Sequence, residues 1–204
     1  MSSRDRTLLE SSFVALGLVN ARNGVGRPLP ARTPGRTCRL TGGSSTTMSI
    51  RFAPEPEPTA NTAALGEGQT TGPLPLGFEF EFFGVRYTWF DLSSDGFMTF
   101  GTQPRRRFIP LSADLNNFIA LGWTDGYTLS RKQVAYEVRG TARRRRLVLS
   151  CTLVPESPEN GLETMTAQLV LHERTGMIDV HTTRQAPPAY RVSQEAVRFT
   201  TAPW

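Results

Sequence analysis

The chain has 204 residues, 38% of them apolar, which fits one domain of about 150 residues plus an extension and excludes a small disulfide-stapled scaffold. Its net charge of +5 is uneven, because residues 1–47 hold seven Arg and two acidic residues, whereas residues 48–204 hold 16 basic and 16 acidic ones. We therefore predict a basic N-terminal docking arm, 1–47, and a neutral domain, 48–204.

The arm shows no convincing strand pattern. Its one apolar stretch, 7–19, is shorter than the roughly 20 residues that span a bilayer, so no transmembrane span is expected. We expect a short amphipathic helix there that docks on a partner or a membrane surface. A signal peptide is the alternative, against which Glu10 argues, because it lies inside the apolar run. Residues 23–47 are rich in Gly, Pro, Arg, Ser and Thr. A segment of this composition is expected to be extended and to become ordered only when it binds a partner.

After the arm, residues 48–52 are predicted to form the first strand of the domain. The segment 54–58, Pro-Glu-Pro-Glu-Pro, predicts a stiff extended linker, and residues 59–73 an irregular loop.

Residues 74–101 predict three strands in a meander. Apolar side chains alternate with polar ones along the first strand, which places Glu79 and Glu81 on a solvent face. The residues expected on its inner face are Leu76, Phe78, Phe80 and Phe82. Gly84 and Gly96 supply the two turns, because Gly takes a positive φ without strain.

Four segments carry a family resemblance: 76–87 (LGFEFEFFGVRY), 93–101 (SSDGFMTFG), 117–125 (NFIALGWTD) and 168–178 (QLVLHERTGMI). Together they resemble the nidogen-like extracellular β-sandwich module that is appended to many secreted bacterial proteins, over residues 48–200. This resemblance implies a β-sandwich with a non-catalytic binding or packing role, outside the cytoplasm. Asp95 and Thr124 depart from the family pattern, which usually has Asn and an acidic residue there; the second departure weakens an acidic metal site.

The remaining strands are expected at 118–123, 133–139, 147–154, 165–171, 177–182 and 196–200. Pairing Glu173 with Gly176 places Leu171 opposite Ile178 and Leu169 opposite Val180, all pointing inward. In that register His172 and His181 face outward and lie too far apart to share a metal. We predict an all-β fold, a two-sheet antiparallel β-sandwich with an extended, mostly irregular N-terminal arm.

No spacing selects a catalytic group, a cofactor or a metal site. The sequence has no nucleophile elbow, phosphate-binding Gly loop, paired-His helix or calcium loop. Cys151 is expected to be a buried free thiol, with a disulfide to Cys38 as the alternative. Four aspartates near turns are expected to cap those turns, with a calcium site as the alternative; they are Asp91, Asp95, Asp114 and Asp125.

Arginine dominates the basic residues, since Lys132 is the only Lys, and this favours multidentate contacts to carboxylate, phosphate or backbone carbonyl. A bias in genome base composition is the alternative explanation. Two Arg runs are the candidate contacts to an anionic surface: Arg105, Arg106 and Arg107, and Arg143, Arg144, Arg145 and Arg146. A solvated hairpin tip is the plainer reading of the second. Only Phe108 adjoins these runs, so stacking on single-stranded nucleic acid is not expected.

These observations predict a non-enzymatic structural or scaffolding subunit, most simply a membrane-extrinsic accessory subunit, extracytoplasmic or membrane-peripheral. Its partners are expected to be protein subunits of a larger complex and anionic lipid headgroups. The arm residues predicted to bind a partner are Leu8, Leu9, Phe13, Leu16, Arg27, Arg32 and Arg36. The alternatives are a free-standing surface adhesin or carbohydrate-binding module that stacks sugar on Trp89, Trp123 or Trp204, and a virion surface or decoration subunit.

Overall fold

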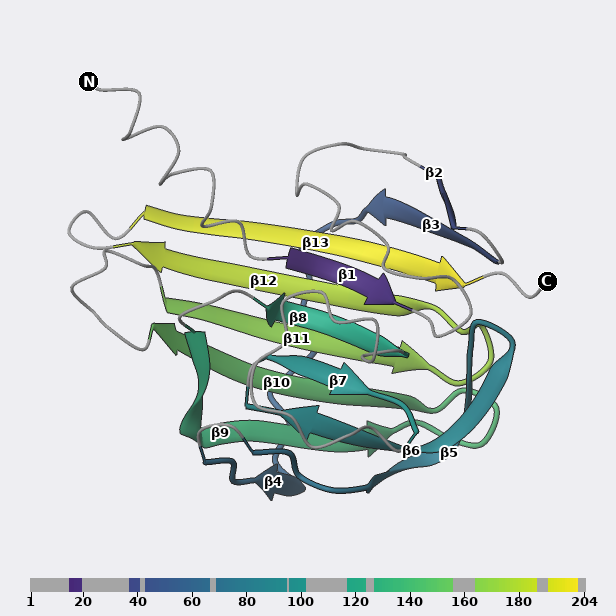
Figure 1. Cartoon of the computed structure of the whole chain (residues 1–204), viewed down its shortest axis with the longest axis horizontal. Helices are drawn as coiled ribbons and strands as arrows, with labels where there is room; N and C mark the ends of the chain where they lie inside the picture. Colours follow the sequence, from purple (N-terminus) through teal and green to yellow (C-terminus); the bar gives the residue numbers. More distant parts are fainter. Residues whose placement is uncertain are drawn as a thin grey trace.

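The described part of the computed structural model forms two antiparallel β-sheets packed face to face (Figure 1). It comprises residues 15–19, 37–40, 43–66, 69–94, 96–101, 117–123, 127–155, 164–186 and 191–201. The strands are β1 (Ala15–Val19), β2 (Thr37–Leu40), β3 (Gly43–Ser49), β4 (Asn61–Ala63), β5 (Leu74–Phe82), β6 (Val85–Ser93), β7 (Phe97–Thr99), β8 (Phe118–Trp123), β9 (Tyr127–Arg139), β10 (Arg146–Pro155), β11 (Thr164–His172), β12 (Ile178–Ala186) and β13 (Arg191–Thr201).

Within the described residues one sheet has five strands, in the order β1-β8-β7-β6-β5, and the other has eight, in the order β2-β3-β13-β12-β11-β10-β9-β4. The predicted all-β, two-sheet fold is confirmed. None of the described segments is a helix long and apolar enough to cross a bilayer.

The meander β5-β6-β7 forms as the alternation predicts. The four apolar residues expected on the inner face of β5 are all buried, whereas Glu79 is exposed. Gly84 and Gly96 both have positive φ, at 77° and 80°. The core between the sheets is rich in phenylalanine, with Phe100 packing against Phe80 and Phe82 at centroid distances of 5.7 and 4.8 Å. Burying such a ring contributes about 1.5–3 kcal/mol to stability, so this cluster is a main source of cohesion.

The predicted register of the hairpin β11-β12 is also confirmed. Leu171 pairs with Ile178 and Leu169 with Val180, and all four side chains are fully buried in the core. Because side chains alternate across a strand, this register turns His181 to the outer face of the eight-stranded sheet. The outer face of that sheet is where the candidate site lies.

Three strands lie where the sequence predicted none, namely β1, β2 and β4, and β3 begins at Gly43, before its predicted start at residue 48. β1 pairs with β8 at an edge of the five-stranded sheet, while β2 and β3 extend the eight-stranded sheet beyond β13. The expected helix over 7–19 is therefore wrong at 15–19, and residues 7–14 lie outside the described residues. Edge pairing uses backbone groups that any sequence carries, so the small and hydroxylated residues of β3 gave no apolar signal.

Other boundaries also move. The first strand of the domain was predicted at 48–52 but ends at Ser49, and β4 lies inside the expected irregular loop of 59–73. β9 and β13 begin earlier than predicted, at Tyr127 and Arg191.

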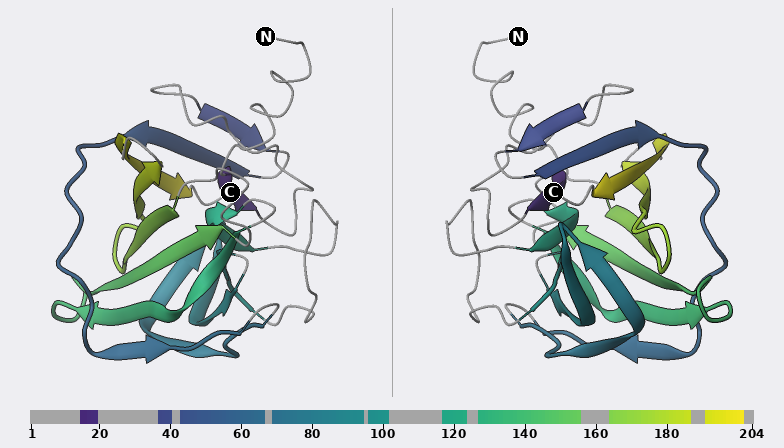
Figure 2. Two further views of the ribbon diagram at one scale, coloured as in Figure 1. Left: turned by 90° about the vertical axis from the view of Figure 1, so that its left-hand side faces the viewer. Right: turned by 90° about the vertical axis from the view of Figure 1, so that its right-hand side faces the viewer.

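The connection from β3 to β4 runs down the outer side of the eight-stranded sheet (Figure 2). It contains the Pro-Glu-Pro-Glu-Pro segment, which is extended as predicted and has no regular secondary structure. Rather than linking two bodies, it lies against the sheet through side-chain contacts. We call residues 52–58 the strap.

Candidate functional site

Glu55 is the main anchor of the strap. Its carboxylate accepts two hydrogen bonds from the Arg146 guanidinium, at 2.6 and 2.9 Å, and lies 3.6 Å from Arg139. The hydrogen bond from Arg146 lowers the pKa of Glu55 below its ordinary value, against the opposing effect of burial. A bidentate charged pair of this geometry is stronger than a neutral hydrogen bond, so the strap is fixed at its middle.

The strap backbone is held as well. The Glu55 N–H donates to Gln168 Oε1 at 2.6 Å, and Gln168 Nε2 donates to the Glu55 carbonyl at 2.9 Å and to Ser150 Oγ at 3.1 Å. Arg139 donates to the carbonyl oxygens of Pro56 and Glu57, at 2.9 and 3.2 Å. Three strands of the sheet, β9, β10 and β11, therefore hold one short extended segment.

The outer face of the sheet beside the strap buries residues that a bare sheet face would expose. Val148 and Val170 pair with each other and alternate with core leucines, which turns them outward, yet they are 0% and 2% exposed. Gln168 and His181 are also buried on this face. Outward-facing valines in β10 and β11 are the one signal in the sequence from which a covered outer face could have been inferred.

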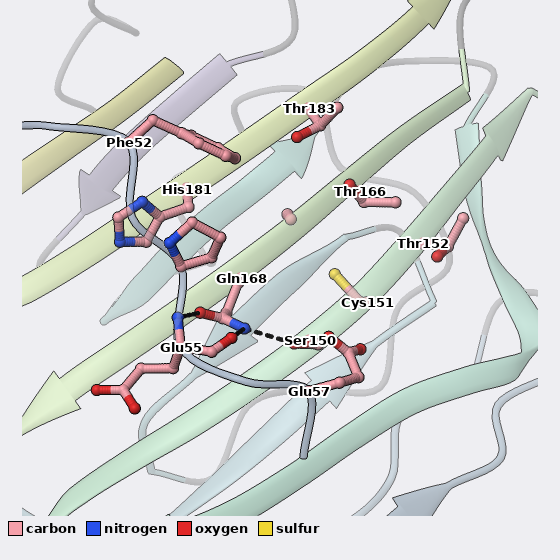
Figure 3. A pocket seen from close by; sticks show the side chains of 12 residues that line it. Phe52, Glu55, Glu57, Ser150, Cys151, Thr152, Thr166, Gln168, His181 and Thr183 are labelled. Carbon is pink, nitrogen blue, oxygen red and sulfur yellow. Dashed lines mark hydrogen bonds between the residues drawn. The ribbon is translucent and has the colours of Figure 1, made fainter. Parts of the chain in front are cut away.

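A cavity of about 210 Å³ lies between the strap and the sheet (Figure 3). On the strap side it is lined by Phe52, Glu55 and Glu57. On the sheet side the lining residues include Ser150, Gln168, His181 and a row of three threonines, Thr152, Thr166 and Thr183. Thr152 pairs with Thr166, and Thr166 with Thr183, so the row crosses three neighbouring strands.

His181 sits at the edge of this cavity with an unsatisfied ring nitrogen. Its ring lies edge-on to Phe52 with centroids 5.7 Å apart, and the side chain is 6% exposed. Its Nδ1 has no hydrogen-bond partner among the described residues. Burial lowers the pKa of His181 below 6.5, which keeps the ring neutral. Leaving a buried polar atom without a partner costs about 1–3 kcal/mol, so this nitrogen is a local cost of the packing around His181.

His172 belongs to a separate ion cluster beside the strap. Its Nε2 lies 3.1 Å from Asp179 Oδ2, and Arg198 donates to the same carboxylate oxygen at 2.7 Å. Burial alone would raise the pKa of Asp179, but the hydrogen bonds from Arg198 and His172 lower it to about 2. The cluster is a satisfied structural ion pair, and the two histidines occupy different environments.

The structure divides the Arg143–Arg146 run in two. Arg145 makes a bidentate pair with Glu173, with Nη2 at 2.6 Å, and also donates to the Gly77 carbonyl. Arg146 is the partner of Glu55 on the strap. These two guanidiniums are neutralised within the molecule, whereas Arg143 and Arg144 are exposed at the tip of the β9-β10 hairpin. The second Arg run, 105–107, lies outside the described residues.

Of the predicted arm contacts, only Leu16 is described, and its backbone lies in β1. The others, Leu8, Leu9, Phe13, Arg27, Arg32 and Arg36, lie outside the described residues.

Cys151 is a buried free thiol, as predicted, and burial raises its pKa to about 12. Of the four aspartates, the described Asp91 lies half-buried on β6, and no group of three metal-binding side chains occurs within the described ranges.

The comparisons with known proteins agree with this fold. The family described as "NIDO related" matches residues 44–199, which is most of the chain. The chain belongs to this family. The match begins within β3 and ends within β13, so the NIDO-related module includes the strap and the strands that hold it. Comparison with curated proteins and with solved structures gives no match.

Proposed function

We propose that this NIDO-related module is a non-enzymatic structural subunit that docks onto a larger assembly, most simply as a membrane-extrinsic accessory subunit. The observation that carries the proposal is a group of exposed arginines at the end of the sandwich formed by the β9-β10 and β11-β12 loops. Arg143 and Arg144 on the β9-β10 loop and Arg174 on the β11-β12 turn are exposed, and these loops are joined by the Glu173 N–H bond to the Arg145 carbonyl, at 3.0 Å. Glu173 and Glu55 are paired with the other two arginines of the run, Arg145 and Arg146.

Exposed guanidiniums that pair with no described residue favour an acidic protein surface or anionic headgroups, because they form multidentate contacts to carboxylate and phosphate. The non-enzymatic character is supported by the state of the candidate groups. The Cys151 thiol is buried with its pKa at about 12, and the Asp179 carboxylate is paired. The arm residues Leu8, Leu9 and Phe13 remain the proposed apolar contact.

The test is extraction of the complex from the native source, followed by size separation at low and high salt. We expect the chain to co-migrate with a large complex at low salt and to leave it at high salt. The variant Arg143→Glu/Arg144→Glu should lose co-migration, and the charge-matched Arg51→Glu/Arg86→Glu should keep it. Migration as a 22.6 kDa monomer in all conditions would refute the docking role.

The second candidate is a free-standing adhesin or carbohydrate-binding module, favoured by Trp89, which is 53% exposed on β6. An exposed indole offers a flat surface on which a sugar ring can stack. Binding to a glycan array that is lost in Trp89→Ala would support this candidate over docking. Trp123 and Trp204, also expected to stack, have no described side chains. Co-purification with capsids instead of membranes would indicate the virion subunit.

A further inference from the structure

We propose that the cavity beneath the strap is a binding site for a small neutral polyhydroxylated molecule, of the size of a single sugar ring or a short polyol. The cavity lies on the eight-stranded sheet, away from Trp89 on β6, and the proposal is independent of the docking role. Its volume of about 210 Å³ sets the size of the ligand. Pockets for drug-sized molecules occupy about 300–1,000 Å³, so this one takes a smaller molecule.

The polar groups of the lining fall into two sets. Gln168 and Ser150 bond to each other, and Gln168 also bonds to the strap, so these groups hold the walls together. The hydroxyls of Thr152, Thr166 and Thr183 make no side-chain hydrogen bond within the described residues and stand in one row on the floor. Each hydroxyl can donate one hydrogen bond and accept others, which matches successive hydroxyls of a polyol.

Phe52 on the strap and His181 on β12 add two aromatic rings to the lining of the cavity. Phe52 and His181 lie together at one side of the cavity, opposite the threonines (Figure 3). The Phe52 ring offers a surface on which the C–H face of the ligand would pack, and the neighbouring His181 ring would sense that contact.

The charges around the cavity disfavour an anionic ligand. Among the described residues no Arg or Lys lines the cavity, and Arg139 and Arg146 bond to Glu55 and to strap carbonyls. An anion would therefore lie beside the Glu57 carboxylate without a counter-ion. Glu57 accepts hydrogen bonds from ligand hydroxyls instead.

The histidine ring resonances of the full chain test the proposal, because the sequence has only two histidines. The probes are glucose, galactose, mannose, N-acetylglucosamine and mannitol, with ethanolamine and inorganic phosphate as the charged probes. We expect at least one neutral probe to shift the His181 ring signals in a saturable manner and to leave those of His172 unchanged. Shifts produced by ethanolamine or phosphate alone would overturn the neutral-ligand assignment. No shift with any probe would overturn the site.

Matched variants then locate the binding. Thr166→Val and Thr183→Val remove lining hydroxyls at nearly constant volume. We expect each substitution to weaken binding and so to raise the dissociation constant at least tenfold. Thr88→Val removes an exposed hydroxyl from β6 and should leave the affinity unchanged. Trp89→Ala should also leave it unchanged, which separates this site from sugar stacking on Trp89. Undiminished binding in the Thr166→Val/Thr183→Val double variant, with its fold checked by thermal melting, would overturn the assignment.

Discussion

At the scale of single residues, Glu55 determines where the strap lies. Two hydrogen bonds from Arg146, a contact with Arg139 and two backbone bonds with Gln168 converge on this residue. The residue is only partly exposed, so water competes less for these bonds than at a surface pair. The sequence displayed Glu55 between two prolines and gave no indication of its partners, which come from strands more than 80 residues away.

Glu55→Gln should lower the free energy of unfolding by about 1–2 kcal/mol, because it converts a charged bidentate pair into a neutral contact. The measurement is urea unfolding at neutral pH. Glu79→Gln is the matched control, since Glu79 pairs with Arg86 on an exposed surface and should change stability little. Equal effects of the two substitutions would show that the strap is not held by Glu55.

His181 should make stability depend on pH. Its folded-state pKa lies below the ordinary value of 6.5, because burial disfavours the charged ring. Below pH 6.5 the unfolded chain therefore binds more protons than the folded one, and stability falls as the pH drops toward the folded pKa. The groups that face the ring are Phe52 on the strap, Asp179 and Arg198 on the sheet, and Glu55.

We expect thermal melts between pH 7 and 5 to show this loss in the wild type and a smaller loss in His181→Gln. His172→Gln serves as the control for removing a histidine outside the cavity. A pH profile that His181→Gln leaves unchanged would contradict a buried, neutral His181.

At the scale of elements, β5 depends on Gly77. Its φ is +78°, the pairing with β6 is irregular between Pro75 and Phe80, and its carbonyl accepts a hydrogen bond from Arg145. A Cβ at this position would lie 2.8 Å from Val138 Cγ2. Only a residue without a side chain allows β5 to bend past β9 here.

Gly77→Ala should therefore destabilise the fold more than Gly72→Ala. Gly72 has a similar φ of +74°, but a Cβ there meets nothing within 4 Å. Positive φ alone costs about 1–2 kcal/mol, and the contact with Val138 adds about 1–3 kcal/mol. Chemical denaturation of both variants and of Gly77→Ala/Val138→Ala measures the difference. The added Val138→Ala should recover part of the loss, and no recovery would place the strain elsewhere.

At the scale of the whole molecule, residues before Met48 belong in part to the sandwich. β1 completes the five-stranded sheet beside β8, and β3 pairs with β13 from Thr201 to Val197. An unpaired strand edge is a template for association with other chains, so these additions also protect the sheets.

Deleting residues 1–49 should lower the unfolding free energy and cause aggregation, because it uncovers the edges of β8 and β13. Deleting residues 1–14 removes no described strand and should leave both properties near those of the full chain. Light scattering and chemical denaturation measure the two effects. A fully stable, monomeric 50–204 fragment would show that β1–β3 are dispensable.

The sequence by itself determined the all-β class, the β5-β6-β7 meander and the register of β11-β12, because alternating side chains and Gly turns are local signals. Only the tertiary structure decided which Arg residues are neutralised and that the segment 52–58 is a strap over a polar cavity. It alone also brought strands from before Met48 into the sheets. The physical reason is that ion pairs, edge pairing and the covering of one face join residues distant in the chain, whose partners no local pattern specifies.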